Sequence, residues 1–330
     1  MTNSFVKSRF NGLFPFVISV VFSLSSCASK NDSGSSSIAA GESFLEVPGG
    51  KIWYKVTGGG NGLPVVLLHG GPGGSSYYLK AFEDLGNERT VIRYDQLGAG
   101  KSDMVIDTGL FTVDHFVNEL DLLRSHLGIS KWHIYGHSWG TILAIEYYRV
   151  NPQHVSSLTF GSSCFDIPDW EQSTNQLLET LPDSLKNAIH FAEETGDFDK
   201  PLYQEAMNQF YAKYVWGPNF DLPDFDSLMS SFNSNLYGYM WGPSEFSITG
   251  TLKDYSANSL LQGITIPTLF TVGEFDEISP DLVKEYAGMV RNSQYTVFEG
   301  SSHMTPWDAR DESVSILREF LNSVDSSKDD

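Results

Sequence analysis

Six short segments of almost continuous apolar residues punctuate this chain, and helical patterns separate several of them. The segments are 64–68, 90–94, 133–135, 155–160, 266–272 and 295–298. Unbroken apolar runs of this length are typical of strands in a parallel sheet that is buried on both faces. Parallel strands need long crossover connections, and these are right-handed. The alternation therefore predicts an α/β fold, with a mostly parallel sheet and helices on both faces.

Local patterns add detail to this expectation. Residues 44–57 alternate between apolar and polar types around a Gly49-Gly50 turn, which predicts an antiparallel hairpin before the parallel strands. A helix is expected at 116–127, where apolar residues share one face and Gly128 follows at the position of a C-terminal cap. A second helix is expected at 141–150, directly after the segment 133–135.

The regular alternation breaks between residues 164 and 262. This stretch looks helical, holds many aromatic residues and contains no convincing parallel strand. We therefore interpret it as an insertion between two parts of one α/β core, at 43–163 and 263–322, followed by a polar tail at 323–330. No internal repeat is evident.

Residues 1–26 resemble a bacterial lipoprotein signal peptide. They carry Lys7 and Arg9, no acidic residue, and an apolar run at 13–24. That run is shorter than the roughly 20 residues that span a bilayer. Cys27 lies where cleavage and acylation would occur, and the segment 27–42 after it reads as a flexible Ser/Gly-rich tether. We expect a lipid-anchored envelope protein, with Ala28 favouring the outer membrane; an ordinary signal peptide with a chance cysteine is the alternative.

Charge and cysteine content exclude several classes of protein. The chain has 21 Lys and Arg against 41 Asp and Glu, a formal net charge of −20, which argues against binding nucleic acid or anionic lipid through a basic surface. Its two cysteines, Cys27 and Cys164, are too few for a disulfide scaffold or a multi-cysteine metal site. If Cys27 is acylated, Cys164 is expected to be a lone buried thiol. We expect neither a metal nor a cofactor.

The strongest chemical signal is the sequence Gly136-His-Ser138-Trp-Gly140, between an expected strand and an expected helix. This is the G-x-S-x-G nucleophile elbow in the context that it requires. The two glycines permit a sharp turn that exposes the Ser138 hydroxyl, and the helix N-terminus favours negative charge nearby. Ser138 is therefore the predicted nucleophile.

A second signal is the glycine-rich segment 69–74 after the expected strand 64–68. Backbone N–H groups in such a loop can stabilise an oxyanion, and those of Gly71 and Trp139 form the natural pair. A tight strand-end turn without a catalytic role is the alternative. We interpret His69 as a residue that braces this loop through hydrogen bonds.

An acid and a histidine complete the set. Glu274, Asp276 and Glu277 follow the strand 266–272, where the acid of a catalytic triad belongs. His303 is the histidine on a strand-end loop beyond this acid. The chain order of Ser138, then an acid, then His303 is that of α/β-hydrolases.

These motifs resemble those of the prolyl iminopeptidase group of α/β-hydrolase serine peptidases, which includes the tricorn-interacting aminopeptidase and is related to amino-acid amidases. The resemblance covers residues 43–322. It rests on these segments: His69-Gly-Gly-Pro-Gly73, Tyr94-Asp-Gln-Leu-Gly-Ala-Gly100, Gly136-His-Ser-Trp-Gly140, Met240-Trp-Gly-Pro-Ser-Glu245-Phe, Thr249-Gly-Thr-Leu-Lys253, Gly273-Glu-Phe-Asp-Glu277 and Ser302-His303.

The resemblance implies a role for each candidate residue. It implies a helical cap at 164–262 and favours Asp276 as the triad acid. It also implies that Glu245, from the cap, and Glu277 bind the free α-amino group of a substrate. Glu245 as a solvated cap residue, and Glu277 as an acid at a helix N-terminus, are the alternatives. The implied activity is that of a serine aminopeptidase that releases proline or a small apolar residue from a peptide or amide.

Three alternatives to this function follow from the same residues. The first two are an amino-acid amidase and a carboxylesterase of the same fold, and the third is a non-catalytic binding protein of the envelope. The charge distribution favours substrates with a free amine, because residues 164–262 contain 15 acidic and 4 basic residues, and an acidic cap attracts cations. A solvated face that charge keeps soluble is the alternative.

Overall fold

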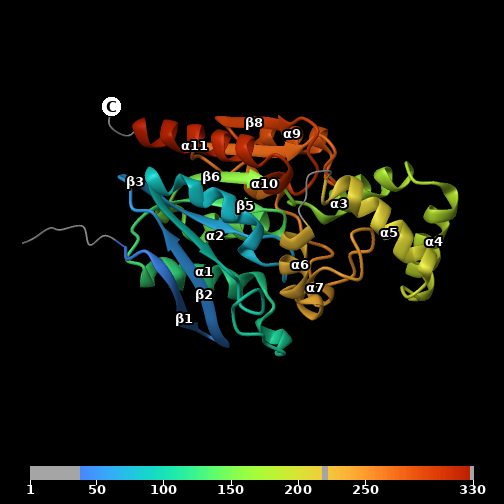
Figure 1. Ribbon diagram of the computed structural model, residues 1–330. Helices are drawn as coiled ribbons and strands as arrows, with labels where there is room; N and C mark the ends of the chain where they lie inside the picture. The colour runs from blue at the N-terminus through green and yellow to red at the C-terminus, as the bar shows by residue number, and fades with distance from the viewer. Residues whose placement is uncertain (1–37, 218–221, 328–330) are drawn as a thin grey trace, which may run out of the picture. The chain divides into compact units, whose positions relative to one another are not determined.

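The computed structural model describes residues 38–217 and 222–327. The predicted signal peptide (1–26), Cys27 and most of the predicted tether (27–42) lie outside the described residues, as does the end of the predicted tail (Figure 1). Within the described part of the chain, no helix combines the length and the apolar character needed to cross a membrane.

One eight-stranded sheet forms the centre of the fold, in the order β1-β2-β4-β3-β5-β6-β7-β8. The strands are β1 (Gly41–Val47), β2 (Gly50–Thr57), β3 (Gly62–Leu68), β4 (Arg89–Tyr94), β5 (Trp132–His137), β6 (Val155–Gly161), β7 (Thr268–Gly273) and β8 (Ser293–Phe298). β1 and β2 form the predicted antiparallel hairpin, β2 pairs antiparallel with β4, and every later pairing is parallel. The predicted mostly parallel α/β fold is confirmed.

Two hydrophobic clusters cover the two faces of this sheet. Successive residues of β3 alternate between them, so that Val66 and Leu68 belong to one cluster and Val65 and Leu67 to the other. This alternation explains the unbroken apolar run in the sequence, because both faces of the strand are buried. The first face packs against α1 (Val113–His126), α2 (Trp139–Val150) and α9 (Pro280–Met289).

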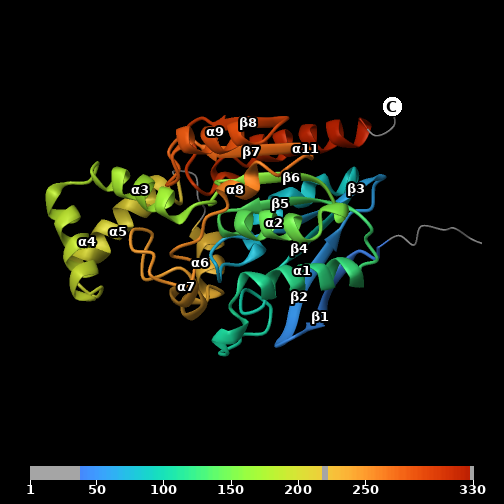
Figure 2. The same ribbon diagram turned by 180° about the vertical axis from the view of Figure 1, so that it is seen from behind.

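The opposite face packs against the 3₁₀ segment η1 (Ser76–Asn87), α10 (Thr305–Asp308) and α11 (Arg310–Ser326). Figures 1 and 2 show α11 on one side of the strands and α1 and α2 on the other. Two shorter 3₁₀ segments, η2 (Thr108–Leu110) and η3 (Pro152–His154), lie in connections.

The interruption between β6 and β7 is helical in its described part. It contains α3 (Ile167–Leu178), α4 (Asp183–Thr195), α5 (Pro201–Tyr214), α6 (Leu222–Ser230), α7 (Ser234–Met240) and α8 (Asn258–Leu261). Its described residues form no strand, only the isolated bridges Asp166–Ser256 and Ser244–Ser247. Helices α3 to α7 extend beyond one end of the sheet (Figure 1).

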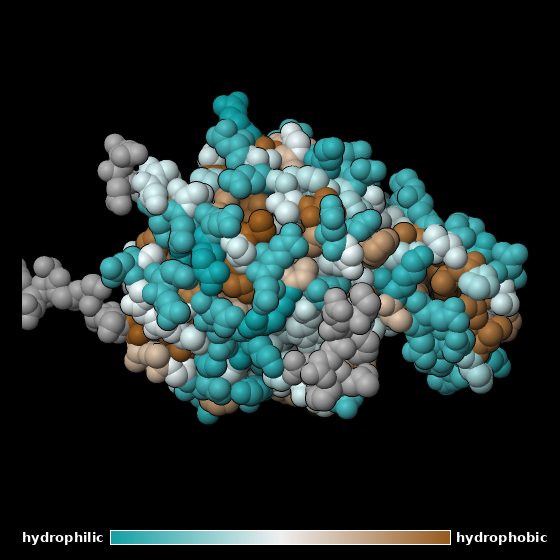
Figure 3. Space-filling model, turned by 45° about the horizontal axis from the view of Figure 1, so that its top comes forward, coloured by the Kyte–Doolittle hydropathy of each residue, from teal (hydrophilic) through white to brown (hydrophobic). Residues whose placement is uncertain are grey.

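The outer part of the cap carries exposed apolar side chains. Figure 3 shows hydrophobic patches among hydrophilic side chains over the region of α4 and α5. Phe191 on α4 and Leu202 on α5 are each about half exposed.

A buried ion pair connects the last helix to the sheet. The guanidinium of Arg89, at the start of β4, is fully buried and donates a 2.9 Å hydrogen bond to Asp325 on α11. The ring of His133 on β5 lies 3.0 Å from the same carboxylate. Helix α11 is therefore held to two central strands by polar contacts as well as by apolar ones.

Candidate active site

The nucleophile elbow has the backbone geometry that its motif predicts. Ser138 lies between β5 and α2 with φ of 54° and ψ of −126°, a strained conformation for a residue with a side chain. A Cβ atom at Gly136 would clash with the Gly140 carbonyl oxygen, and one at Gly140 would clash with that of Leu68. The glycines thus allow α2 to pack closely against the sheet while Ser138 is held at its carboxyl edge.

The predicted oxyanion donors flank the same position. Gly71 adopts φ of 119° in the loop after β3 and lines a cavity together with Ser138. Trp139 is the first residue of α2, where N–H groups have no acceptor within the helix. Among the described residues, neither of these backbone N–H groups donates a hydrogen bond. Both donors are therefore available to a ligand.

Gln96, in the loop after β4, connects the two oxyanion elements. Its side-chain oxygen accepts a 2.8 Å hydrogen bond from the indole N–H of Trp139, and its side-chain nitrogen donates to the His69 carbonyl at 3.1 Å. The Gln96 backbone N–H donates to His69 Nε2 at 3.0 Å, and the other ring nitrogen of His69 donates to the Gly70 carbonyl at 2.9 Å. His69 braces the loop, as predicted.

Tyr78 and His137 connect the oxyanion loop to the loop of His303. The Gly70 N–H donates to the Tyr78 hydroxyl at 2.7 Å, and this hydroxyl lies 3.0 Å from Nδ1 of His137. Nε2 of His137 donates to the His303 carbonyl oxygen at 2.9 Å, which makes Nδ1 the acceptor for Tyr78. Burial and the neighbouring His303 lower the pKa of His137 to about 3, so it is neutral at neutral pH.

Asp276 and His303 come together after β7 and β8. Nδ1 of His303 donates to Asp276 Oδ1 at 2.7 Å, and both side chains are buried. Asp276 also accepts the backbone N–H of Ile278 at 3.1 Å. Of the three acids considered from the sequence, Glu274 is exposed and accepts the Gly300 N–H instead.

Asp308 on α10 supports the loop that carries His303. Its carboxylate accepts the Ser302 N–H at 2.5 Å and the hydroxyl of Ser301. Burial raises the pKa of Asp308 to about 6. The loop is further tied to the cap, because the His303 N–H donates to the Tyr214 carbonyl at 3.0 Å.

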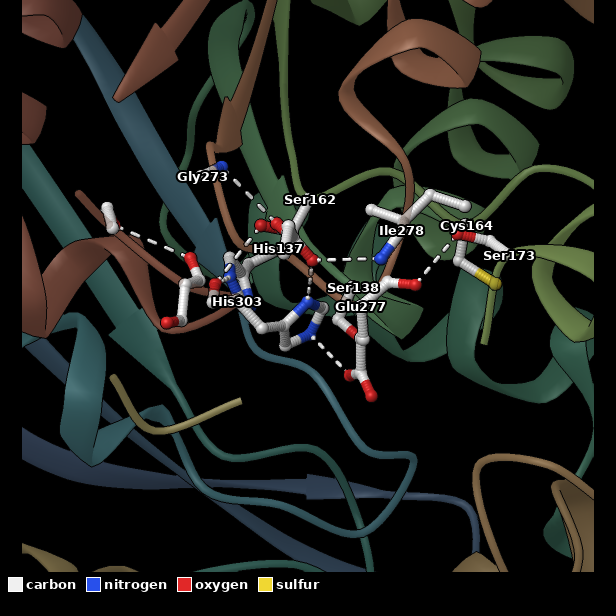
Figure 4. A network of polar contacts seen from close by, with 12 residues as sticks. His137, Ser138, Ser162, Cys164, Ser173, Gly273, Glu277, Ile278 and His303 are labelled. Carbon is white, nitrogen blue, oxygen red and sulfur yellow. Dashed lines mark hydrogen bonds and ion pairs between the residues drawn. The ribbon is translucent and has the colours of Figure 1, made fainter. Parts of the chain in front are cut away.

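Glu277 faces the second ring nitrogen of His303. Its Oε1 lies 3.5 Å from His303 Nε2, and a dashed line joins the two side chains in Figure 4, beside Ser138. The Glu277 side chain is buried, and its Oε2 has no hydrogen-bond partner among the described residues. Burial, Glu245 and Asp276 together raise the pKa of Glu277 well above its usual range.

Glu245 reaches the site from the cap segment after α7. Its Oε1 accepts a 2.5 Å hydrogen bond from the Tyr237 hydroxyl. Burial raises the pKa of Glu245, while the Tyr237 hydrogen bond and the nearby His303 lower it. The structure thus places a carboxyl group from the cap and one from the core in the same site.

A single cavity of about 390 Å³ joins these groups. Its lining includes Ser138, His303, Glu245, Glu277 and Gly71. The cap contributes an apolar wall, formed by Tyr211, Val215, Trp216, Leu228, Met229 and Phe232. The cavity therefore combines acidic groups with an apolar wall.

Some of the aromatic residues of the cap line this cavity and others do not. Tyr211 and Tyr237 line it, whereas Phe210 and Trp241 are buried and Tyr239 is partly exposed outside it. Cys164 is a free, buried thiol, as predicted. Among the described residues, no group of three or more His, Cys, Asp or Glu side chains is arranged to hold a metal ion.

Sequence reasoning missed three residues of the site: Gln96, Tyr78 and Asp308. Gln96 lies within a segment that carries the family resemblance, and this was the available signal. Tyr78 lies 59 positions from its partner His137, so no local pattern could have joined them.

Comparison with known proteins agrees with this architecture. The family model for the alpha/beta hydrolase fold matches residues 64–309. The chain is 39% identical over 285 residues to the proline iminopeptidase of Heyndrickxia coagulans, covering 86% of this chain and 99% of the relative. It is 36% identical over 293 residues to the proline iminopeptidase of Saccharolobus solfataricus, covering 87% and 94% of the two chains.

Solved structures give the same result. The crystal structure of proline iminopeptidase from Mycobacterium smegmatis superposes with a TM-score of 0.80 at 29% identity, covering 87% of this chain and all of the other. That of VinJ superposes with a TM-score of 0.81 at 30% identity, covering 86% and 99%. The predicted resemblance is confirmed: this chain belongs to the α/β-hydrolase fold family and, within it, to the proline iminopeptidase family.

Proposed function

We propose that this protein is a serine aminopeptidase that releases an N-terminal proline or small apolar residue from peptides or amides. The observation that carries the proposal is one cavity lined by Ser138, by His303 with Asp276 behind it, and by the carboxyl groups of Glu245 and Glu277. A nucleophile with a base supports acyl transfer, and two acids beside it select an amine.

In the proposed reaction, Ser138 attacks the carbonyl carbon of the N-terminal residue while His303 Nε2 takes the hydroxyl proton. The Gly71 and Trp139 N–H groups stabilise the oxyanion. His303 then protonates the leaving amine, and a water molecule activated by His303 hydrolyses the acyl-enzyme. Asp276 keeps the Nδ1–H tautomer of His303 and stabilises its cation.

The two glutamates determine which substrates are accepted. An ammonium group offers three donors, and charge-assisted hydrogen bonds to Glu245 and Glu277 would fix it about one residue from the scissile carbonyl. An N-acetylated substrate offers these two acids no ammonium group, so it is rejected because it cannot form the charge-assisted hydrogen bonds that hold a free N-terminus. The apolar cap wall would then receive the side chain and the leaving group.

Arylamide kinetics test the proposal. We expect prolyl- and alanyl-p-nitroanilide to be hydrolysed and N-acetylprolyl-p-nitroanilide to be resistant. Ser138→Ala should abolish turnover, and Glu245→Ala should raise KM. Equal hydrolysis of free and acetylated substrates would contradict the proposal, and hydrolysis restricted to short acyl esters would establish a carboxylesterase. If a fluorophosphonate does not label Ser138, the protein is a non-catalytic binding protein.

We propose in addition that the enzyme is a lipoprotein of the bacterial cell envelope, anchored through acylated Cys27 to the outer membrane. The signal-like segment 1–26 and the Ser/Gly-rich segment after Cys27 support this proposal. Metabolic labelling with a palmitate analogue should modify the protein, and Cys27→Ala should abolish the label and release the enzyme from membranes. A label that survives Cys27→Ala would contradict the anchor.

A further inference from the structure

The two ring nitrogens of His303 have different acidic partners. Nδ1 donates to Asp276 at 2.7 Å, and Nε2 lies 3.5 Å from Glu277 Oε1. Because a carboxylate only accepts, Nδ1 carries the proton in the neutral ring, and Nε2 is the atom that must accept a proton from Ser138. Among the described residues, no hydrogen bond joins the Ser138 hydroxyl to this nitrogen; the atom faces Glu277 instead (Figure 4).

The Glu277 carboxyl group lacks good hydrogen-bond partners where it lies. It is 2% exposed, its contact with His303 is long, and its Oε2 has no hydrogen-bond partner among the described residues. Leaving a buried polar atom unpaired is unfavourable. A group that enters the cavity with several N–H donors would therefore be a stronger partner for Glu277 than His303 is.

We infer that the amine of the substrate activates the catalytic base. In the empty site the Glu277 carboxyl group contacts His303 Nε2, and a bound ammonium group draws this carboxyl group away. In the empty site a protonated Glu277 directs its O–H to Nε2. When the ammonium binds, this proton leaves to water and the carboxylate turns to the ammonium. The Nε2 lone pair of His303 then becomes available to the Ser138 hydroxyl.

This inference rests on the proposed function for the nature of the amine, which is the N-terminus of the substrate. It assigns a second role to Glu277 that Glu245 does not share. Glu245 lines the same cavity, but its Oε1 is held by the Tyr237 hydroxyl at 2.5 Å. Among the described residues, the cavity carboxyl group that contacts His303 Nε2 is that of Glu277.

The decisive experiment supplies the scissile bond and the amine in two separate molecules. p-Nitrophenyl acetate carries an acyl group but no amine, and pyrrolidinium carries the amine but no carbonyl. We expect low concentrations of pyrrolidinium to raise kcat/KM of the wild-type enzyme for p-nitrophenyl acetate by about fivefold, the factor corresponding to one ordinary hydrogen bond. Tetramethylammonium, which has no N–H donor, is the control and should not stimulate.

Two variants show which carboxyl group is responsible for the stimulation by pyrrolidinium. Glu277→Ala frees Nε2 permanently, so it should raise p-nitrophenyl acetate hydrolysis by about the same factor and remove the response to pyrrolidinium. Glu245→Ala is the matched control, because it removes a carboxyl group from the same cavity but not the contact with His303. It should weaken the response to pyrrolidinium, and its ester rate should stay below that of Glu277→Ala. The rate of Ser138 labelling by a fluorophosphonate should follow the same pattern.

Pure inhibition of p-nitrophenyl acetate hydrolysis by pyrrolidinium would overturn the inference, as would the absence of any response. An ester rate in folded Glu277→Ala equal to or below that of wild type would do the same. If Glu277→Ala does not fold, as judged by thermal unfolding, the wild-type experiment alone decides. These results are independent of the proposed function: failure to hydrolyse any aminoacyl arylamide would refute the aminopeptidase, whereas stimulation by pyrrolidinium would still support activation by amines.

Discussion

The indole N–H of Trp139 donates a 2.8 Å hydrogen bond to the side-chain oxygen of Gln96. The same glutamine donates to the His69 carbonyl, two residues before Gly71. One buried side chain therefore sets the spacing between the loop after β3 and the start of α2, which carry the two proposed oxyanion donors.

Replacing this glutamine should impair catalysis more than binding. Gln96→Leu removes both side-chain hydrogen bonds at similar size, so the donors lose their fixed spacing, and displacements of about 1 Å in an active site cost on the order of a hundredfold in rate. We expect kcat for prolyl-p-nitroanilide to fall by tenfold or more with little change in KM. Gln96→Glu, which keeps an acceptor for Trp139, should lie between. A change confined to KM would refute this role.

Tyr78→Phe should reduce stability. The hydroxyl accepts from Gly70 and donates to His137, so its loss leaves two buried groups without a partner. We expect the free energy of unfolding to fall by about 2 kcal/mol in urea titrations. Tyr77→Phe, at the adjacent and more exposed position of η1, is the control and should change the free energy by less than about 0.5 kcal/mol. Equal effects of the two substitutions would contradict the network.

Glu119 on α1 should make stability depend on pH. Its side chain is buried, accepts the Leu97 N–H at 3.1 Å, and has its pKa raised to about 8 by burial. The native state therefore retains a proton that the unfolded chain loses above its ordinary pKa of about 4.5. It follows that the contribution of this group to stability decreases as pH rises from about 5 to about 8.

Glu119→Gln does not titrate and isolates this effect. In urea titrations at pH 5, 6.5 and 8, we expect the free energy of unfolding of the wild type, minus that of the variant, to decrease with each increase in pH. A constant difference between the two proteins would show that Glu119 has an ordinary pKa in the native state.

Breaking the ion pair between Arg89 and Asp325 should destabilise the fold. Asp325→Ala leaves a buried guanidinium without its anion, and we expect a loss of about 3 kcal/mol in the free energy of unfolding. The double variant Arg89→Met/Asp325→Ala should recover part of this loss, because no charge is then left unpaired. Fluorophosphonate labelling of Ser138 in folded Asp325→Ala should be unaffected. Loss of labelling would show that the ion pair between Arg89 and Asp325 supports the active site.

The fold and the strand–turn–helix geometry around Ser138 were predictable because their signals are local. The strand runs, the Ser138 elbow and the hairpin at 44–57 each lie within a few consecutive residues, and the structure contains all three. Some strand boundaries differ from the predicted ones, because backbone pairing decides where a strand begins. The strand expected at 266–272 is β7, which begins at Thr268, because Pro267 has no N–H to donate to the ladder.

Other parts of the site depend on tertiary contacts. Three acids within four positions follow β7, and the turn that points Asp276 rather than Glu274 toward His303 is set by hydrogen bonds to Gly273 and Ile278. The contact between Glu277 and Nε2 of His303 needs the loops after β7 and β8 to be neighbours, which is a property of the strand order. The assignment of Glu245 to the amine remains a prediction from the family resemblance.

β6 and β7, which flank the cap in the chain, are direct neighbours in the sheet, with Leu158 opposite Thr268. The chain thus leaves and re-enters the core at adjacent strands, so that the core's hydrogen-bond ladder is continuous across the point of insertion. The whole cap can then be lengthened, shortened or exchanged without altering the strand pairing that positions Ser138, Asp276 and His303. In such an architecture, substrate preference can diverge between relatives while the reaction itself is inherited unchanged.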